Sequence, residues 1–203
     1  PSPSISNKVR QEILKVAVKA ARSVGYVNVG TIEFIVDEKD QFYFLEMNSR
    51  IQVEHTISEM VTSRDLVIEQ IRLAAGEPLG YSQSSIDFSG HAIECRINAE
   101  DPDNDFSPSP GKINRCLFPG GIGIRLDTHI YSGYVVSPYY DSLIGKLIAY
   151  GKDRSESIAR MRRALAEFEI DGIHTTIPLH TRILRNSRFL KADIYTNFLE
   201  SRI

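Results

Sequence analysis

The chain has 203 residues, of which 42% are hydrophobic and 25% are charged, and its formal net charge is −2. This composition supports a sizeable buried core and gives no reason to expect binding to nucleic acid or to an anionic membrane surface. No apolar run is long enough to span a bilayer, and two cysteines imply no disulfide framework and favour a reducing compartment.

The first predicted elements are a helix and a hairpin. Residues 6–23 carry apolar side chains at helical spacing, and Gly25 would end the helix. Strand-like runs follow at about 29–36 and 41–47, and the polar segment 37–40 between them predicts a hairpin turn.

The remaining elements follow a further helix. Residues 64–75 predict that helix, and the polar stretch 81–85 predicts a domain boundary, so we expect domains at residues 1–84 and 85–203. Cys95 lies in an apolar run and is expected to be buried and unreactive. We expect an α+β fold, whose later segments are strands near 90–99, 112–118, 122–127 and 142–150 and helices near 158–168 and 177–185.

A run of alternating polar residues follows the second strand-like run. Its members are Glu46, Asn48, Arg50, Gln52 and Glu54. An extended chain would place all five side chains on one face. The combination of carboxylates, an amide and a guanidinium predicts a site for a metal ion and a small anion, and the alternative is a charged strand edge.

Three of the polar residues suit a metal ion. Glu33 lies inside the apolar run 30–36, where an acid is costly to bury without a partner. Mg²⁺ prefers oxygen ligands and commonly takes one or two carboxylates, so Glu33 and Glu46 are candidate ligands. Asn48 would add an amide oxygen.

The other polar residues suit an anion. Arg50 offers a planar fork of donors that matches a carboxylate or bicarbonate, and Gln52 could add a further donor. Glu54 is then the remaining acid, and a spare carboxylate beside a bound anion is a candidate general base.

The segment from Phe44 to His55 closely resembles the signature of biotin carboxylases, the ATP-grasp subunits or domains of acetyl-CoA, propionyl-CoA and pyruvate carboxylases. Other ATP-grasp enzymes share the glutamate pair and the asparagine, so a ligase of the carbamoyl-phosphate synthase type is the alternative. The continuation from Arg50 to His55 points to the biotin-dependent branch. The resemblance covers nearly the whole chain through residues 59–60, 76–79, 90–102, 108–113, 119–121, 138–142 and 171–173.

The resemblance implies a C-terminal half of an ATP-grasp domain followed by a mixed, β-rich biotin carboxylase C-terminal domain. It implies carboxylation of biotin on a carrier protein through carboxyphosphate, with ATP, bicarbonate and magnesium or manganese. The matches of Glu33, Glu46 and Asn48 bind the metal. The matches of Arg50, Gln52 and the Val53 backbone hold bicarbonate, and the match of Glu54 deprotonates it.

In the second domain, the match of Arg96 stabilises the biotin enolate, and the match of Asp141 lies near the biotin end of the site. The implied partners are a biotin carboxyl carrier protein or domain, a carboxyltransferase and a second copy of the enzyme. Arg125 matches a dimer-interface position, although Ile122 stands where the family usually has an aromatic residue. The implied compartment is the bacterial cytoplasm, or the mitochondrial matrix or plastid of a eukaryote.

Family members are much longer than this chain. The resemblance therefore implies a C-terminal portion without the glycine-rich lid and the phosphate-binding lysines. We expect the isolated chain to hydrolyse no ATP, and the non-enzymatic alternative is a module that assembles with a missing half.

Overall fold

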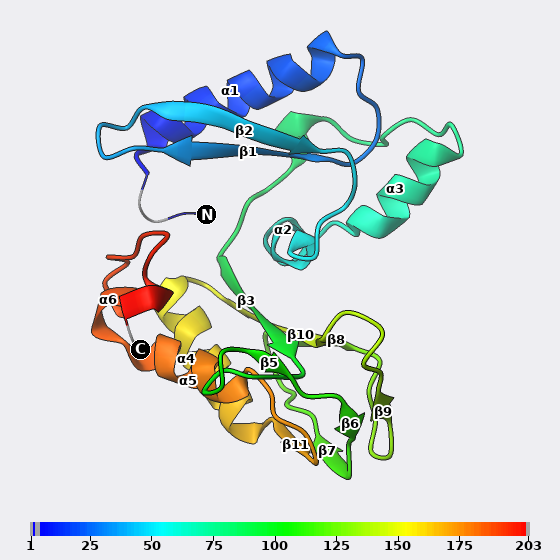
Figure 1. Ribbon diagram of the computed structural model, residues 1–203. Helices are drawn as coiled ribbons and strands as arrows, with labels where there is room; N and C mark the ends of the chain where they lie inside the picture. The colour runs from blue at the N-terminus through cyan, green and yellow to red at the C-terminus, as the bar shows by residue number, and fades with distance from the viewer. Residues whose placement is uncertain (1, 3–4, 202–203) are drawn as a thin grey trace. The chain divides into compact units, whose positions relative to one another are not determined.

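The computed structural model describes residue 2 and residues 5–201, and the chain divides into two compact units, with the boundary in the sequence between Phe88 and Ser89 (Figure 1). All strand pairs in the described part of the chain are antiparallel, and helices accompany them in both units. The α+β class is therefore confirmed. No helix in residues 5–201 is long and apolar enough to cross a bilayer.

The first unit is a helix, a hairpin and two further helices. Its elements are α1 (Asn7–Ser23), β1 (Thr31–Val36), β2 (Phe42–Asn48), α2 (His55–Thr62), α3 (Leu66–Ala74) and the short 3-10 helix η1 (Gln83–Ser85). The Ser6 hydroxyl caps α1 by accepting the Val9 N–H at 3.3 Å. Gly25 follows the helix with φ +62°, as its predicted role in ending the helix requires.

A turn and a bulge shape the hairpin of β1 and β2. Asp37 Oδ1 accepts the N–H groups of Lys39 and Gln41, each at 2.9 Å, which confirms the predicted turn. The strand register shifts between Glu33 and Phe34, so that β2 carries one extra residue at this point.

The second unit contains a three-stranded sheet with the order β3-β10-β8 and three small two-stranded sheets, which pair β4 with β5, β6 with β9, and β7 with β11. In chain order, its elements are β3 (His91–Asn98), β4 (Glu100–Asp101), β5 (Ser107–Pro108), β6 (Gly111–Lys112), β7 (Arg115–Leu117), β8 (Ile124–Thr128), β9 (Val135–Val136), β10 (Leu143–Gly151), α4 (Arg154–Glu167), β11 (Glu169–Asp171), α5 (Ile177–Arg185), α6 (Ser187–Leu190) and η2 (Leu199–Ser201).

The predicted strand near 112–118 was wrong as a single element. It divides into β6 and β7, which belong to different sheets. Ile113 lies between them, fully buried, and its N–H donates to the Tyr134 carbonyl at 2.8 Å. The next N–H, of Asn114, donates instead to the Asp171 carbonyl at 2.8 Å. The run divides because β6 pairs with β9 whereas β7 pairs with β11, so the partner strand changes at Ile113 and Asn114.

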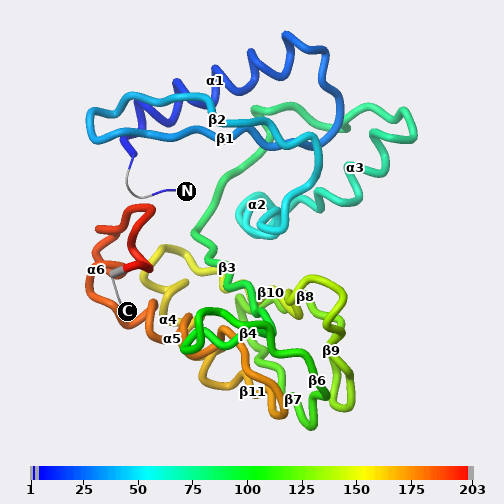
Figure 2. Tube along the Cα trace, in the orientation of Figure 1, coloured from blue at the N-terminus to red at the C-terminus, as the bar shows by residue number. Residues whose placement is uncertain are grey.

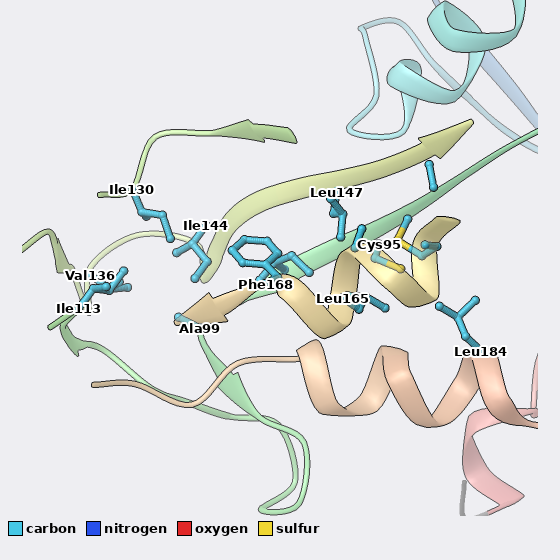
Figure 3. Close-up of a cluster of buried hydrophobic side chains, with 14 of the residues drawn as sticks. Cys95, Ala99, Ile113, Ile130, Val136, Ile144, Leu147, Leu165, Phe168 and Leu184 are labelled. Carbon is cyan, nitrogen blue, oxygen red and sulfur yellow. The ribbon is translucent and has the colours of Figure 1, made fainter. Parts of the chain in front are cut away.

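The main core lies in the second unit, where α4 contacts β10, β3 and α5. The trace runs from β10 into α4 and on through β11 to α5 (Figure 2). Side chains from the sheet and from both helices meet between them, as Figure 3 shows for Leu147, Leu165 and Leu184. Cys95 belongs to this cluster, and burial raises the pKa of its thiol to about 12, so the prediction of a buried, unreactive cysteine is confirmed.

Candidate functional site

Two glutamates of the first unit lie directly opposite each other on neighbouring strands. Glu33 of β1 pairs with Glu46 of β2, so their side chains share one face of the hairpin. Like charges directly opposite each other destabilise a strand pair, and a hydrogen-bond donor or a cation near both carboxylates offsets their repulsion. Asn48 supplies the donor: its Nδ2 lies 3.0 Å from Glu33 Oε1 and 2.8 Å from Glu46 Oε1. A second amide, Gln52 Nε2, donates to Glu33 Oε1 at 2.9 Å.

These groups fit a hard divalent cation. Mg²⁺ takes few carboxylates from a protein and completes its shell with phosphate oxygens and water. Rotating the Asn48 amide by half a turn exchanges Nδ2 and Oδ1, so this side chain can offer an oxygen ligand in the same place. In the part of the chain that the structure describes, no group of three or more Asp, Glu, His or Cys residues could hold a metal. A divalent cation at this position would therefore have Glu33, Glu46 and an amide as candidate protein ligands and would need further ligands from phosphate or water.

The predicted extended face does not continue beyond Asn48. β2 ends at that residue because its last partner on β1 is Thr31, and no strand pairs with residues 49–54. The chain turns instead, with the His55 N–H donating to the Gln52 carbonyl at 3.2 Å, and enters α2, which the sequence reading did not predict. The expectation of one face for all five polar residues was therefore wrong, because a loop carries three of them.

This loop still brings groups that suit an anion. Arg50 is exposed, and its guanidinium donates to the Ile51 carbonyl at 3.3 Å, which leaves donors of its planar fork for other acceptors. Glu54 is exposed at the N-cap position of α2, where the N–H groups of the first helical turn favour a negative charge. Val53 lies between them in the turn that opens the helix.

Two residues of α2 support the loop. His55 Nδ1 lies 2.7 Å from the Gln52 carbonyl oxygen, and His55 Nε2 lies 3.9 Å from Glu59 Oε1. The same carboxylate oxygen accepts the Leu66 N–H at 2.9 Å, although Glu59 is buried. Glu59 thereby joins α2 to the start of α3. The sequence reading assigned it no role, and its spacing of four residues from His55 on a helix was the available signal.

In the second unit, Arg96 lies on the sheet face opposite to the core. Its neighbours on β3, Cys95 and Ile97, point into the core, and Arg96 is half exposed. Arg96 Nε lies 3.9 Å from Glu94 Oε1, so Arg96 also forms an ion pair along its own strand. Lys146 is its cross-strand partner on β10, so two cations stand side by side on this face.

The third strand balances this charge. Asp127 on β8 lies opposite Lys146, with its Oδ2 3.8 Å from Lys146 Nζ. Arg125 donates to both oxygens of the same carboxylate, each at 2.8 Å. The outer face therefore holds charges of both signs, and Glu94 and Asp127 form ion pairs with Arg96 and the cations beside it.

The comparisons with known proteins identify the family. The model named Biotin carboxylase C-terminal domain matches residues 94–201, and the model named Carbamoyl-phosphate synthase L chain, ATP binding domain, matches residues 1–82. The chain belongs to the biotin carboxylase family. It is 54% identical over 200 residues to the biotin carboxylase of Nostoc sp., and the match covers 98% of this chain and 45% of that protein.

Other relatives in the biotin carboxylase family are parts of pyruvate carboxylase and of 2-oxoglutarate carboxylase. The chain is 53% identical to a pyruvate carboxylase component of Methanothermobacter thermautotrophicus, over 98% of this chain and 40% of that protein. It superposes with a TM-score of 0.96 and 49% identity on the biotin carboxylase domain dimer of Hydrogenobacter thermophilus 2-oxoglutarate carboxylase, over 99% of this chain and 44% of that one. That structure contains MgADP, ADP and bicarbonate. The chain thus spans less than half the length of these biotin carboxylase relatives.

The last predicted site residue, Asp141, is exposed between Tyr140 and Ser142. Its Oδ1 accepts the Leu143 N–H at 3.3 Å, at the start of β10. A pocket of about 170 Å³ opens beside it, lined by Tyr140, Ser142 and residues of the neighbouring loops. The predicted residues of this biotin carboxylase chain are thus divided between the two units, with Glu33 to Glu54 in the first and Arg96 and Asp141 in the second.

Proposed function

We propose that this chain supplies the metal-, bicarbonate- and biotin-contacting residues of an enzyme that carboxylates biotin on a carrier protein, with ATP as the energy source. The observation that carries the proposal is the pair Glu33 and Glu46, in which the Asn48 amide contacts both carboxylates and the Gln52 amide contacts Glu33. The membership in the biotin carboxylase family supports it, as do the nucleotide and bicarbonate in the Hydrogenobacter relative.

The first unit would bind and activate bicarbonate beside ATP. Glu33, Glu46 and Asn48 would hold a divalent cation, which neutralises phosphate charge when bound. Arg50, Gln52 and the Val53 N–H would orient bicarbonate. The carboxylate of Glu54 would take the bicarbonate proton, so that a bicarbonate oxygen attacks the γ-phosphorus of ATP, ADP leaves and carboxyphosphate forms.

The second unit would act on biotin. Carboxyphosphate decomposes to carbon dioxide and phosphate, and the phosphate would deprotonate biotin. Arg96 would place its guanidinium beside the ureido oxygen, where negative charge develops. Asp141 would lie near the same end of the site. The ion pair with Glu94 and the row of charges on β10 and β8 support an oriented Arg96.

The partners of the proposed enzyme are a biotin carboxyl carrier protein or domain and a carboxyltransferase protein or domain. A second copy is also proposed, because the Hydrogenobacter relative is described as a dimer. Arg125 would belong to that interface, while the 85% exposed Ile122 would meet the partner with an aliphatic side chain. The relatives include components of pyruvate carboxylase and of 2-oxoglutarate carboxylase.

The direct test uses a hybrid in which this chain continues the N-terminal portion of the Nostoc relative. We expect bicarbonate-dependent release of phosphate from ATP that biotin stimulates. Glu54→Gln should lower that rate by roughly 100-fold, because the general base is lost, while ATP affinity is retained. Near-normal turnover of this variant at every pH would remove Glu54 from the reaction, and a change in ATP binding alone would move it to the metal site.

The match of residues 1–82 to the carbamoyl-phosphate synthase ATP-binding model supports a second candidate function, that of a ligase of the carbamoyl-phosphate synthase type. Stimulation of the hybrid by an ammonia donor and not by biotin would favour it. For the isolated 203-residue chain we expect no bicarbonate-dependent phosphate release above that of Glu46→Ala. Release above this control would exclude the non-catalytic assembly module.

A further inference from the structure

The outer edge of β3 is closed by side chains of a helix. β3 is an edge strand of its sheet, so alternate backbone groups face away from β10. The Arg96 carbonyl oxygen lies 3.0 Å from Thr176 Oγ1 and 2.8 Å from His180 Nε2. The Asn98 N–H donates to Thr176 Oγ1 at 3.0 Å, and the Thr176 N–H donates to the Asn98 carbonyl at 3.1 Å. Thr176 thus replaces a neighbouring strand residue at this position.

This use of Thr176 is unusual for its place in the sequence. Thr176 is the N-cap residue of α5, where a hydroxyl normally accepts an N–H of its own helix. Its side chain makes no such bond, and Pro178 in the first turn removes one N–H that would need a cap. The hydroxyl is therefore available to β3, 80 residues earlier in the chain.

The helix that carries His180 is anchored in the core. Leu184 lies one turn further along the same face of α5 and is fully buried in the core, where Figure 3 shows it near Leu165. Thr176 is itself only 5% exposed. With Leu184 fixed in the core, the helix backbone that carries His180 is anchored beside the Arg96 carbonyl.

We propose that Thr176 and His180 are positioning residues for Arg96, which hold its backbone so that the guanidinium meets the developing oxyanion of biotin. This inference rests on the proposed function of Arg96. Arg96 leaves the strand on the opposite side from its core-facing neighbours, so the direction of its side chain follows the backbone at residues 96–98. We call the hydrogen bonds of Thr176 and His180 to the backbone of residues 96 and 98 the clamp. Loss of the clamp would let the edge strand β3 shift, and a misplacement of about 1 Å at a reacting centre costs up to roughly 100-fold in rate.

The first experiment measures the clamp in the 203-residue chain by amide hydrogen exchange. Thr176→Val removes the acceptor of the Asn98 N–H and should raise its exchange rate by at least about tenfold, while Thr176→Ser should retain protection. Thr175→Val is the matched control, because Thr175 is similarly buried (8% exposed) and makes no hydrogen bond with the described residues. Unchanged exchange at Asn98 in Thr176→Val overturns the clamp.

The second experiment measures its effect in the hybrid enzyme. Thr176→Val and His180→Ala should each lower the kcat of biotin carboxylation by roughly 10- to 100-fold, with biotin-independent ATP hydrolysis within about twofold of the parent. His180→Gln should restore much of the rate, because its amide can donate to the same carbonyl.

Equal losses in both reactions that follow the melting temperature would overturn the positioning role. A parent hybrid that carboxylates no biotin would refute the proposed function. It would also refute the role of Thr176 and His180 in positioning Arg96 for catalysis. The exchange measurement on the 203-residue chain would still decide the structural clamp by itself.

Discussion

At the scale of single residues, the pair Glu33 and Glu46 should lower the stability of the hairpin and strengthen the binding of a metal ion. Glu46→Gln removes one of two like charges that face each other, so the melting temperature should stay the same or rise. The same change should weaken Mn²⁺ binding by at least about tenfold, as expected when a metal site loses a carboxylate. Titration of Mn²⁺ by electron paramagnetic resonance measures it. Glu38→Gln, an exposed acid in the turn of the same hairpin, is the control, and equal affinities in both variants would contradict the assignment.

The pKa of His180 is lowered by burial, and the hydrogen bond to the Arg96 carbonyl raises it in part. Because the unfolded chain then binds the proton more readily, the free energy of unfolding should fall as the pH drops through about 6.5. His180→Gln removes this titration, so the wild type should lose stability relative to the variant between about pH 8 and about pH 5. Urea denaturation across this range measures the difference. Parallel curves for the two proteins would show that His180 makes no contribution.

At the scale of elements, Glu59 connects two helices through one buried oxygen. Glu59→Ala leaves the Leu66 N–H without its acceptor and should lower the free energy of unfolding by about 1–3 kcal/mol, the cost of an unsatisfied buried donor. Glu59→Gln keeps an acceptor and should lose less. Ser58→Ala, on the exposed face of α2, is the control for helix propensity. Equal stabilities of the two alanine variants in chemical denaturation would exclude the link.

The sequence predicts those elements whose signals are local. α5 has the predicted bounds because Pro178 and the apolar spacing both act within the helix. α2 was missed because the alternation before it continues smoothly from β2, and only the absence of a partner strand ends the extended chain. β11 was missed because three residues form a strand only where β7 is present to pair with them. The carboxylate pair could be predicted, whereas the clamp of Thr176 on β3 could not.

At the scale of the whole molecule, the two units differ in how much apolar surface they bury. Among the described buried apolar residues, only Val9 and Val61 precede Ser89. We therefore expect the first unit to unfold at lower denaturant concentration than the second, because local stability follows buried apolar contacts. Limited proteolysis should leave a resistant fragment that begins between Ser82 and Ser89, where the chain forms no strand. Mass spectrometry of the fragment checks this, and simultaneous loss of both units would contradict it.

The bulge in the hairpin separates two chemical surfaces that a regular strand would mix. Without the extra residue, Phe44 and Glu46 would share a face, because they are two positions apart. The register shift lets Phe44 pair with Phe34, whose ring also meets Phe42, while Glu46 stays opposite Glu33. The alternation of side chains in β2 is therefore reversed at Leu45, so that Phe42 and Phe44 lie on one face and Glu46 on the other. A ligand at the carboxylates therefore lies on the opposite face from Phe42 and Phe44, and Tyr43, which pairs with Ile35, is the aromatic residue of this strand on the carboxylate face. Inserting or deleting one residue between the turn and Asn48 would reverse this arrangement.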